Sequence, residues 1–216
     1  ITGVYHCGIR FSGGSVKVTG NKIGTKAKPV SYPPIYVTEA NSYVKNKKDT
    51  RKAESVTGGC VDSNTIYTPY DKSNNGAITV YGKSVLSSIS RNTIRSDKGT
   101  GITIGVRSKV ANVKGNTVTA SARGAIFITG STVTSVDGNT LTTAVSSGSR
   151  GAVCVYSKSR LTSVSKNKVK ATKGTGIVIG SGCTAKNVNS NTITAPAKSG
   201  IYLTGCTATN VNSNTI

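Results

Sequence analysis

Basic side chains are the residues with reactive or binding chemistry that recur most regularly in this sequence. Six of them, the basic row, fall one to four residues before a glycine that opens a Gly-x-apolar-x-apolar segment: Lys72, Lys98, Arg123, Arg150, Lys173 and Lys198. The chain holds 28 Lys and Arg against 7 Asp and Glu, a formal charge of +21. Because like charges repel unless water or an anion separates them, this row predicts either a solvated edge that opposes aggregation or a track for an acidic polymer.

Acidic and histidine residues are too few and too scattered to indicate a catalytic or metal-binding site. Glycoside hydrolysis needs two suitably spaced carboxylates; Asp71 and Asp97 occupy similar positions, but each adjoins a lysine that can form a local ion pair with it. His6 is the sole histidine, so a His-based triad and a multi-histidine metal site are excluded. Seven scattered acids do not supply a calcium cluster. We therefore expect no metal site and no cofactor.

An Asn followed by Thr or Lys and then an aliphatic residue recurs along the chain. The eight anchors are Asn21, Asn64, Asn92, Asn116, Asn139, Asn167, Asn191 and Asn214. Successive anchors lie 43, 28, 24, 23, 28, 24 and 23 residues apart, so the pattern 28, 24, 23 occurs twice. KGTGITIG at 98–105 returns as KGTGIVIG at 173–180, 75 residues later. The chain therefore contains a tandem duplication of a three-unit block.

Each unit contains three short apolar segments that alternate with period two, as half-buried strands do. The first is the Gly-x-apolar-x-apolar segment, the second has apolar residues six and three positions before the Asn, and the third has its apolar residue two positions after it. Gly and Asn lie between the segments, where turns often need positive φ. Three strands in roughly 23 residues predict a parallel β-solenoid whose coils stack about 4.8 Å apart and share one core.

The Gly-Ile-x-Ile strand, the Val-x-x-Val strand and the following Asn-Thr-Ile resemble the repeats of pectin-lyase-like proteins over nearly the whole chain. The resemblance implies an all-β fold, a right-handed parallel β-helix of about eight coils with three short strands per coil. One domain, 1–216, would carry a polar basic excursion at about 45–55. The superfamily includes lyases, hydrolases, epimerases, phage tailspikes and non-catalytic surface proteins, so the resemblance specifies the fold and leaves the activity open.

The middle residue of each first strand is expected to point outward. This outer row comprises Arg10, Tyr36, Thr79, Thr103, Phe127, Cys154, Val178 and Tyr202. In pectin-lyase-like enzymes this sheet and its loops form the polysaccharide groove, so Tyr36, Phe127 and Tyr202 are candidates to stack on sugar rings. Isolated surface aromatics are the alternative. Some lyases of the superfamily use an Arg or Lys base, a role that Arg10 or a member of the basic row could take.

Two further sets of residues are predicted to stack from coil to coil. The Asn anchor tolerates left-handed φ, and its amide can bond to the Asn of the next coil, which would build a structural ladder. Cys183 and Cys206 lie 23 residues apart in matching GCTA contexts. They form either a disulfide or a pair of small side chains that fill equivalent core positions.

Three functions fit these observations. The first is a non-catalytic β-helix, secreted or at the cell surface, that presents a basic face to an anionic polysaccharide or cell-wall polymer. The second is the β-helical part of a lyase or epimerase acting on uronate-containing glycans, and the third is a structural stalk without a ligand. Because a solenoid needs polar caps and none is evident, we expect a fragment of a larger protein. No motif of nucleic-acid recognition accompanies the charge, and no apolar run reaches the roughly 18 residues of a membrane span.

Overall fold

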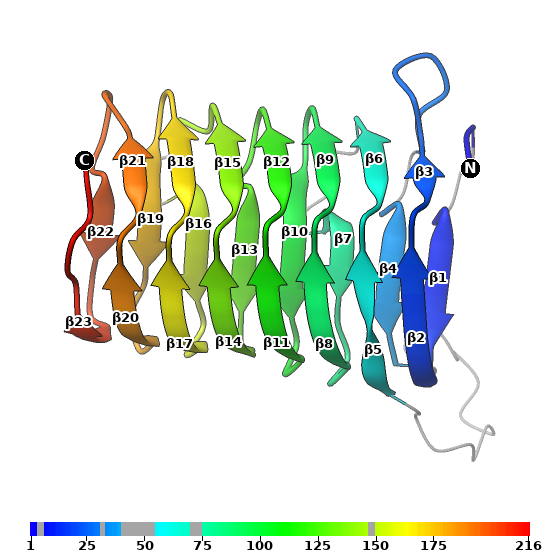
Figure 1. Ribbon diagram of the computed structural model, residues 1–216, viewed down its shortest axis with the longest axis horizontal. Coiled ribbons are helices and arrows are strands. Elements are labelled where there is room, and N and C mark those ends of the chain that lie inside the picture. Colours follow the sequence, from blue (N-terminus) through cyan, green and yellow to red (C-terminus); the bar gives the residue numbers. More distant parts are fainter. Residues whose placement is uncertain (4–6, 31–32, 40–54, 70–74, 147–149) are drawn as a thin grey trace.

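The computed structural model describes residues 1–3, 7–30, 33–39, 55–69, 75–146 and 150–216. The polar excursion predicted at about 45–55 therefore lies almost entirely outside the described residues, as do His6, Asp71 and Lys72. The described residues form short strands and turns and no helix. Figure 1 shows the strands side by side along the long axis, with the two ends of the chain at opposite ends of the stack.

Three parallel sheets run the length of this stack, and each coil contributes one strand to each sheet. The first sheet contains β1 (Ile9–Ser12), β4 (Ile35–Thr38), β7 (Gly76–Val80), β10 (Thr100–Gly105), β13 (Ile126–Thr129), β16 (Gly151–Tyr156), β19 (Thr175–Ile179) and β22 (Ile201–Leu203). The second contains β2 (Gly14–Thr19), β5 (Val56–Asp62), β8 (Val85–Ser90), β11 (Lys109–Lys114), β14 (Thr132–Asp137), β17 (Arg160–Ser165), β20 (Thr184–Asn189) and β23 (Thr207–Asn210). The third contains β3 (Lys22–Ile23), β6 (Thr65–Thr68), β9 (Thr93–Ser96), β12 (Thr117–Ala120), β15 (Thr140–Thr143), β18 (Lys168–Ala171) and β21 (Thr192–Thr194).

The expected architecture, an all-β parallel solenoid with three short strands per coil, is confirmed. The third sheet has seven named strands, and its eighth member is a single bridge between Thr192 and Thr215. In the part of the chain that the structure describes, the solenoid therefore makes about seven full turns and begins an eighth.

The core is a set of aliphatic columns, because each apolar position of one coil pairs with the same position of the next. One column of the first sheet consists of Ile35, Ile78, Ile102, Ile126, Val153 and Ile177. All six are fully buried. Each coil thus hides its apolar face against its neighbours, which supplies the main favourable free energy of folding. The three apolar segments of the sequence repeat are the inward positions of the three sheets.

The Asn ladder is present with eight rungs. From Asn21 to Asn214, the side-chain amide of each Asn donates to Oδ1 of the Asn one coil further on, at 2.9–3.0 Å. That same Oδ1 accepts the backbone N–H of the preceding Asn, and within the ladder a second amide hydrogen reaches a carbonyl of the previous coil, as from Asn139 to Val113. The buried amides are therefore satisfied by each other and by the backbone.

The expectation that the Asn itself takes left-handed φ is wrong. Positive φ falls on the residue just before each Asn, with values of 52–69°. These residues are Gly20, Ser63, Arg91, Gly115, Gly138, Lys166, Ser190 and Ser213. The residue in the left-handed conformation turns the chain between the second and third sheets, and this turn directs the following Asn side chain into the stack.

The glycines that open the first strands do not have positive φ, contrary to the role expected for glycines between strands. They are required by close approach of the backbone instead. A Cβ on Gly124 would lie 2.7 Å from the carbonyl oxygen of Gly151, and one on Gly151 would lie 2.7 Å from that of Thr175. Any side chain here would collide with the next coil, which is the physical reason for the recurring Gly.

Candidate polyanion-binding surface

The outer row of the first sheet is aligned as the sequence predicts, but its central members do not face solvent. Arg10, Tyr36, Thr79, Thr103, Phe127, Cys154, Val178 and Tyr202 are consecutive partners across the eight strands. Thr79 and Thr103 are 0% exposed, and Cys154 and Val178 are 1% exposed. The expectation that the whole row faces outward is therefore wrong for these four residues.

Segments entering the first strands cover this row. The Thr79 hydroxyl donates to the carbonyl of Gly76 and accepts its N–H, and Cys154 Sγ makes the same pair of contacts with Gly151. A Cβ on Gly124 would lie 3.5 Å from Cys154 Sγ, so the neighbouring coil also closes over the thiol. Burial raises the pKa of Cys154 to about 11, which leaves it protonated and inert at neutral pH.

Aromatic side chains remain partly accessible at three places on the first sheet. Tyr36 lies edge-on to Tyr81 with ring centroids 6.3 Å apart, and the guanidinium of Arg10 lies 5.8 Å from the centroid of Tyr36. Phe127 packs against Tyr156 at 5.9 Å, and Tyr202 is 45% exposed. Tyr36 and Phe127 are half-buried in contacts of their own, so Tyr202 is the most exposed of these three candidate aromatic residues.

The described members of the basic row lie at the corner between the third and first sheets, on five successive coils. Lys98, Lys173 and Lys198 are exposed, whereas Arg123 and Arg150 are half-buried. Neither of the two ion pairs found within the described residues involves any of these five side chains. At about 4.8 Å per coil, the row extends over about 20 Å. The row therefore places one cation on each of these five coils, and neither Asp62 nor Asp97 forms its ion pair with one of them.

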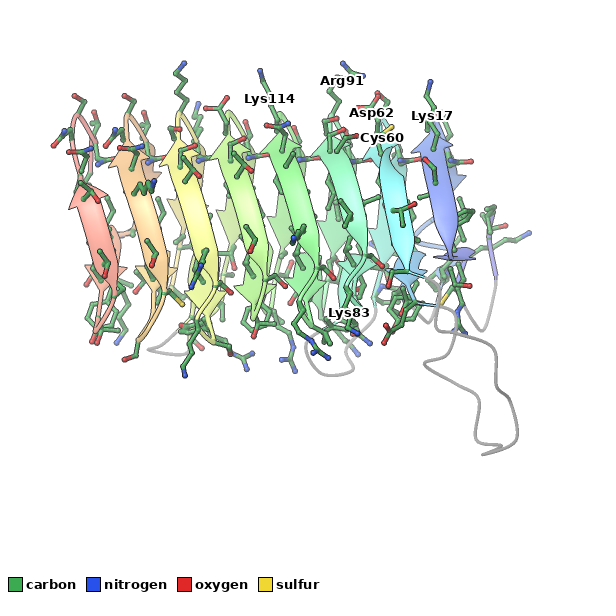
Figure 2. All side chains as sticks on the ribbon, turned by 90° about the horizontal axis from the view of Figure 1, so that it is seen from below. Lys17, Cys60, Asp62, Lys83, Arg91 and Lys114 are labelled. Atoms are coloured by element: carbon green, nitrogen blue, oxygen red, sulfur yellow. The ribbon has the colours of Figure 1, made fainter. Side chains whose placement is uncertain are left out.

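The outer face of the second sheet carries a polar cluster that sequence reasoning missed. Lys17, Cys60, Asp62, Arg91 and Lys114 project from one face, whereas Lys83 lies on the opposite side (Figure 2). Lys17 and Cys60 are strand partners, and Asp62 lies in the same row as Lys114, two strands away. The Asn anchors could have revealed this alignment, since Lys17 and Cys60 each lie four residues before an anchor and Asp62 and Lys114 each lie two residues before one.

Asp62 is the acidic residue of that cluster, and its carboxylate is bound by three neighbouring side chains. Its carboxylate forms an ion pair with Arg91 and accepts hydrogen bonds from Ser90 at 2.8 Å and Ser63 at 3.1 Å. Burial alone would raise the pKa of Asp62, but the hydrogen bonds from Arg91 and the two serines hold this pKa below its ordinary value. Asp62 is therefore an ionised anchor for Arg91 and is not poised as a general acid.

Asp97 is also engaged, in a way that differs from the expected pairing with Lys98. Its carboxylate accepts a hydrogen bond from the Tyr67 hydroxyl at 2.6 Å and another from Arg95 Nε at 3.0 Å. These hydrogen bonds lower the pKa of Asp97, with the bond from Tyr67 the largest cause, and that bond raises the pKa of Tyr67. The expected Asp97–Lys98 pair is wrong, because Asp97 forms its ion pair with Arg95 instead.

The cysteines in the structure are free thiols, Cys183 and Cys206 included. Cys183 belongs to the hydrophobic core and Cys206 packs against it, so of the two alternatives the structure has the core-filling pair. Elsewhere among the described residues, no three His, Cys, Asp or Glu side chains come together as a metal site would need. The described residues also contain no helix long and apolar enough to cross a membrane.

Three parallel sheets wound by one repeating coil place this chain in the class of parallel β-helix proteins. A family model for the right-handed β-helix region matches residues 1–141 and 54–216, two ranges that together span the chain. The chain therefore belongs to the right-handed β-helix family. Searches of curated proteins and of solved structures found no match.

Proposed function

We propose that this chain is the β-helical part of a secreted or cell-surface protein, and that it binds an anionic polysaccharide or cell-wall polymer without catalysing its cleavage. The observation that carries the proposal is the basic row, which presents a cation at the same corner of five successive coils. Asp62 and Asp97, two of the four described acids, are engaged by Arg91 and Arg95. A linear polyanion could therefore lie along this corner and contact every coil.

Repetition favours a polymer over a small anion. Each coil adds one cation at a spacing of about 4.8 Å, so binding strength would grow with the number of coils that one ligand chain spans. Polyuronates and sulfated glycans carry charges at regular intervals and would meet several row members at once. Such binding depends on exposed charges and weakens steeply as salt is added.

A retention experiment tests the proposal. The protein is applied to immobilised heparin and to immobilised polygalacturonate and eluted with a salt gradient. A Lys98→Gln/Arg123→Gln/Lys173→Gln variant is compared with Lys22→Gln/Lys168→Gln/Lys170→Gln, which removes three exposed cations from the outer face of the third sheet. We expect the first variant to elute at much lower salt than the second. Equal shifts would show that only net charge matters and would contradict binding along the row.

A second measurement separates binding from catalysis. The protein is incubated with polygalacturonate, alginate and glycosaminoglycans while absorbance is followed at the band of unsaturated uronates. We expect no increase. A rise above the buffer blank that persists through purification would replace the binding proposal with a lyase.

A further inference from the structure

A second cationic feature lies at a different corner, between the first and second sheets, and is called here the corner notch. It is a hollow of about 250 Å³ lined by four cations, Arg107, Lys109, Lys158 and Arg160, with Gly130 and Thr132 between them. All four cations are exposed, and none of the residues lining the hollow is acidic. The notch is separate from the basic row, which follows the corner between the third and first sheets.

The notch exists because the turn of its middle coil is one residue shorter than the turns on either side. Gly105, Thr129 and Tyr156 are consecutive strand partners, and so are Lys109, Thr132 and Arg160. Between these two sets of partners, the outer coils have three residues and the middle coil has two. The outer turns therefore project as walls, and the middle turn has Gly130, which bears no side chain, at its floor.

The cations stand on these two walls in matched pairs. Arg107 and Lys109 belong to one wall, and Lys158 and Arg160 belong to the other. Lys109 and Arg160 flank Thr132 in the strand register, so their Cα atoms are two strand spacings apart, about 9.6 Å. This width leaves space for one tetrahedral oxyanion between the walls, with the exposed Thr132 hydroxyl below it.

The tandem duplication shows that the fold does not require these charges. Residues 75 positions from Arg107 and Lys109 are Gly182 and Thr184, and the residue 75 positions before Arg160 is Val85. The floor glycine is retained, since Gly130 corresponds to Gly205, and both have positive φ. These counterparts lie in two different coils, Gly182 and Thr184 in one and Lys83 and Val85 in another, and three of the four lack a cation. The equivalent turns therefore fold without three of these four charges.

We propose that the corner notch is a specific binding site for a phosphate or sulfate ester carried by an anionic glycan. Arginine forms bidentate hydrogen bonds with such oxyanions, and lysine adds a compact point charge. A phosphate monoester carries about −1.5 to −2 charges at neutral pH, which is closer to what four cations can neutralise than a single uronate carboxylate. The notch would hold one ester group firmly, whereas the basic row would hold the polymer over its length.

The test takes its substitutions from the duplicate itself. Lys109→Thr/Arg160→Val installs the residues found at positions 184 and 85, and Lys168→Thr/Lys170→Thr is a control of equal charge that installs the Thr found at the same third-sheet positions of neighbouring coils. Inorganic phosphate and inorganic sulfate are titrated at constant ionic strength while the amide NMR signals are followed. We expect saturable shifts at Gly130, Ser131 and Thr132, at least tenfold weaker affinity in the notch variant, and less than twofold change in the control.

The outcomes separate the notch from the proposed function. Equal losses in both variants, or shifts spread over all exposed lysines, would overturn the notch. Saturable binding of phosphate by a protein that no polyanion column retains would keep the notch and refute binding along the basic row. Heparin retention that depends on the basic row, without saturable phosphate binding at the notch, would keep binding along the row and refute the notch. The anion with the higher affinity, phosphate or sulfate, then indicates the ester group that the notch prefers. Unchanged unfolding temperatures would show that the variants are folded.

Discussion

Asn139 illustrates how single residues hold one coil to the next. Its Oδ1 accepts both the backbone N–H and the side-chain amide of Asn116, and its own amide reaches Asn167 and the carbonyl of Val113. The side chain is 1% exposed, so water cannot replace these partners. One side-chain amide therefore bonds to groups on both neighbouring coils, and its loss leaves buried polar atoms without partners.

Replacing Asn139 by Ala should lower the free energy of unfolding by about 2–4 kcal/mol, because the N–H of Asn116 and the carbonyl of Val113 lose their partners in a buried site. Urea unfolding followed by circular dichroism measures the change. Asn112→Ala is the matched control, since Asn112 lies on the exposed face of the second sheet, and it should change the free energy by less than about 0.5 kcal/mol. Equal losses in the two variants would mean that the ladder does not stabilise the fold.

At the scale of the elements, glycine has two different structural roles, one in the turns before the Asn anchors and one at the start of the first strands. Before the Asn anchors, Gly alternates with Ser, Arg and Lys at positive φ, so the conformation is required there and glycine itself is not. At the glycines that open the first strands, such as Gly124 and Gly151, the backbone of the next coil lies too close for an added side chain. Glycines that look equivalent in the sequence therefore differ in how much the fold depends on them.

Replacing Gly151 by Ser should cost about 3 kcal/mol of stability, because the new Cβ would lie 2.7 Å from the carbonyl oxygen of Thr175. Gly138→Ser should cost about 1 kcal/mol at most, since nothing lies within 4 Å of the new atom and Ser213 occupies the same position 75 residues later. Thermal unfolding of both variants provides the comparison. A larger loss at Gly138 would contradict the assignment of close approach to Gly151.

The whole molecule carries +21 charges on a narrow stack of coils. Chain folding brings these charges together, and their mutual repulsion opposes the compact state. Salt shortens the range of that repulsion to about 10 Å at 0.1 M. A bound polyanion would remove it more effectively and would stabilise the folded state by mass action.

The unfolding temperature should therefore rise as sodium chloride is added from low concentration. At fixed ionic strength, heparin should raise it further, by an amount equivalent to about 2.7 kcal/mol at one hundred times its dissociation constant. Scanning calorimetry with dextran as the neutral control checks both effects. A fall in unfolding temperature with salt would contradict self-repulsion, and a heparin effect equal to that of dextran would contradict binding to the folded state.

Much of the fold could be predicted from the sequence because a solenoid repeats its local interactions. The spacing of the Asn anchors, the 75-residue duplication and the apolar segments each specify contacts between neighbouring coils, and these contacts are the core. The sequence also aligned Thr79, Thr103 and Cys154 correctly in one outer row. It could not show their burial, because strand alternation predicts only which residues point away from the core, and the contacts with Gly76 and Gly151 that cover Thr79 and Cys154 exist only in the folded coil.

Surface features also differ in whether the sequence alone could predict them. The sequence by itself determined the strand repeat, the ladder of Asn residues and the recurrence of cations before six of the eight first strands, since all three follow from one periodic pattern. Only the tertiary structure decided that Arg91 pairs with Asp62 and that a turn shortened by one residue opens a notch between Lys109 and Arg160. The ion pair joins side chains of adjacent coils, and the notch arises from a difference in turn length between coils, so both exist only when the coils are stacked.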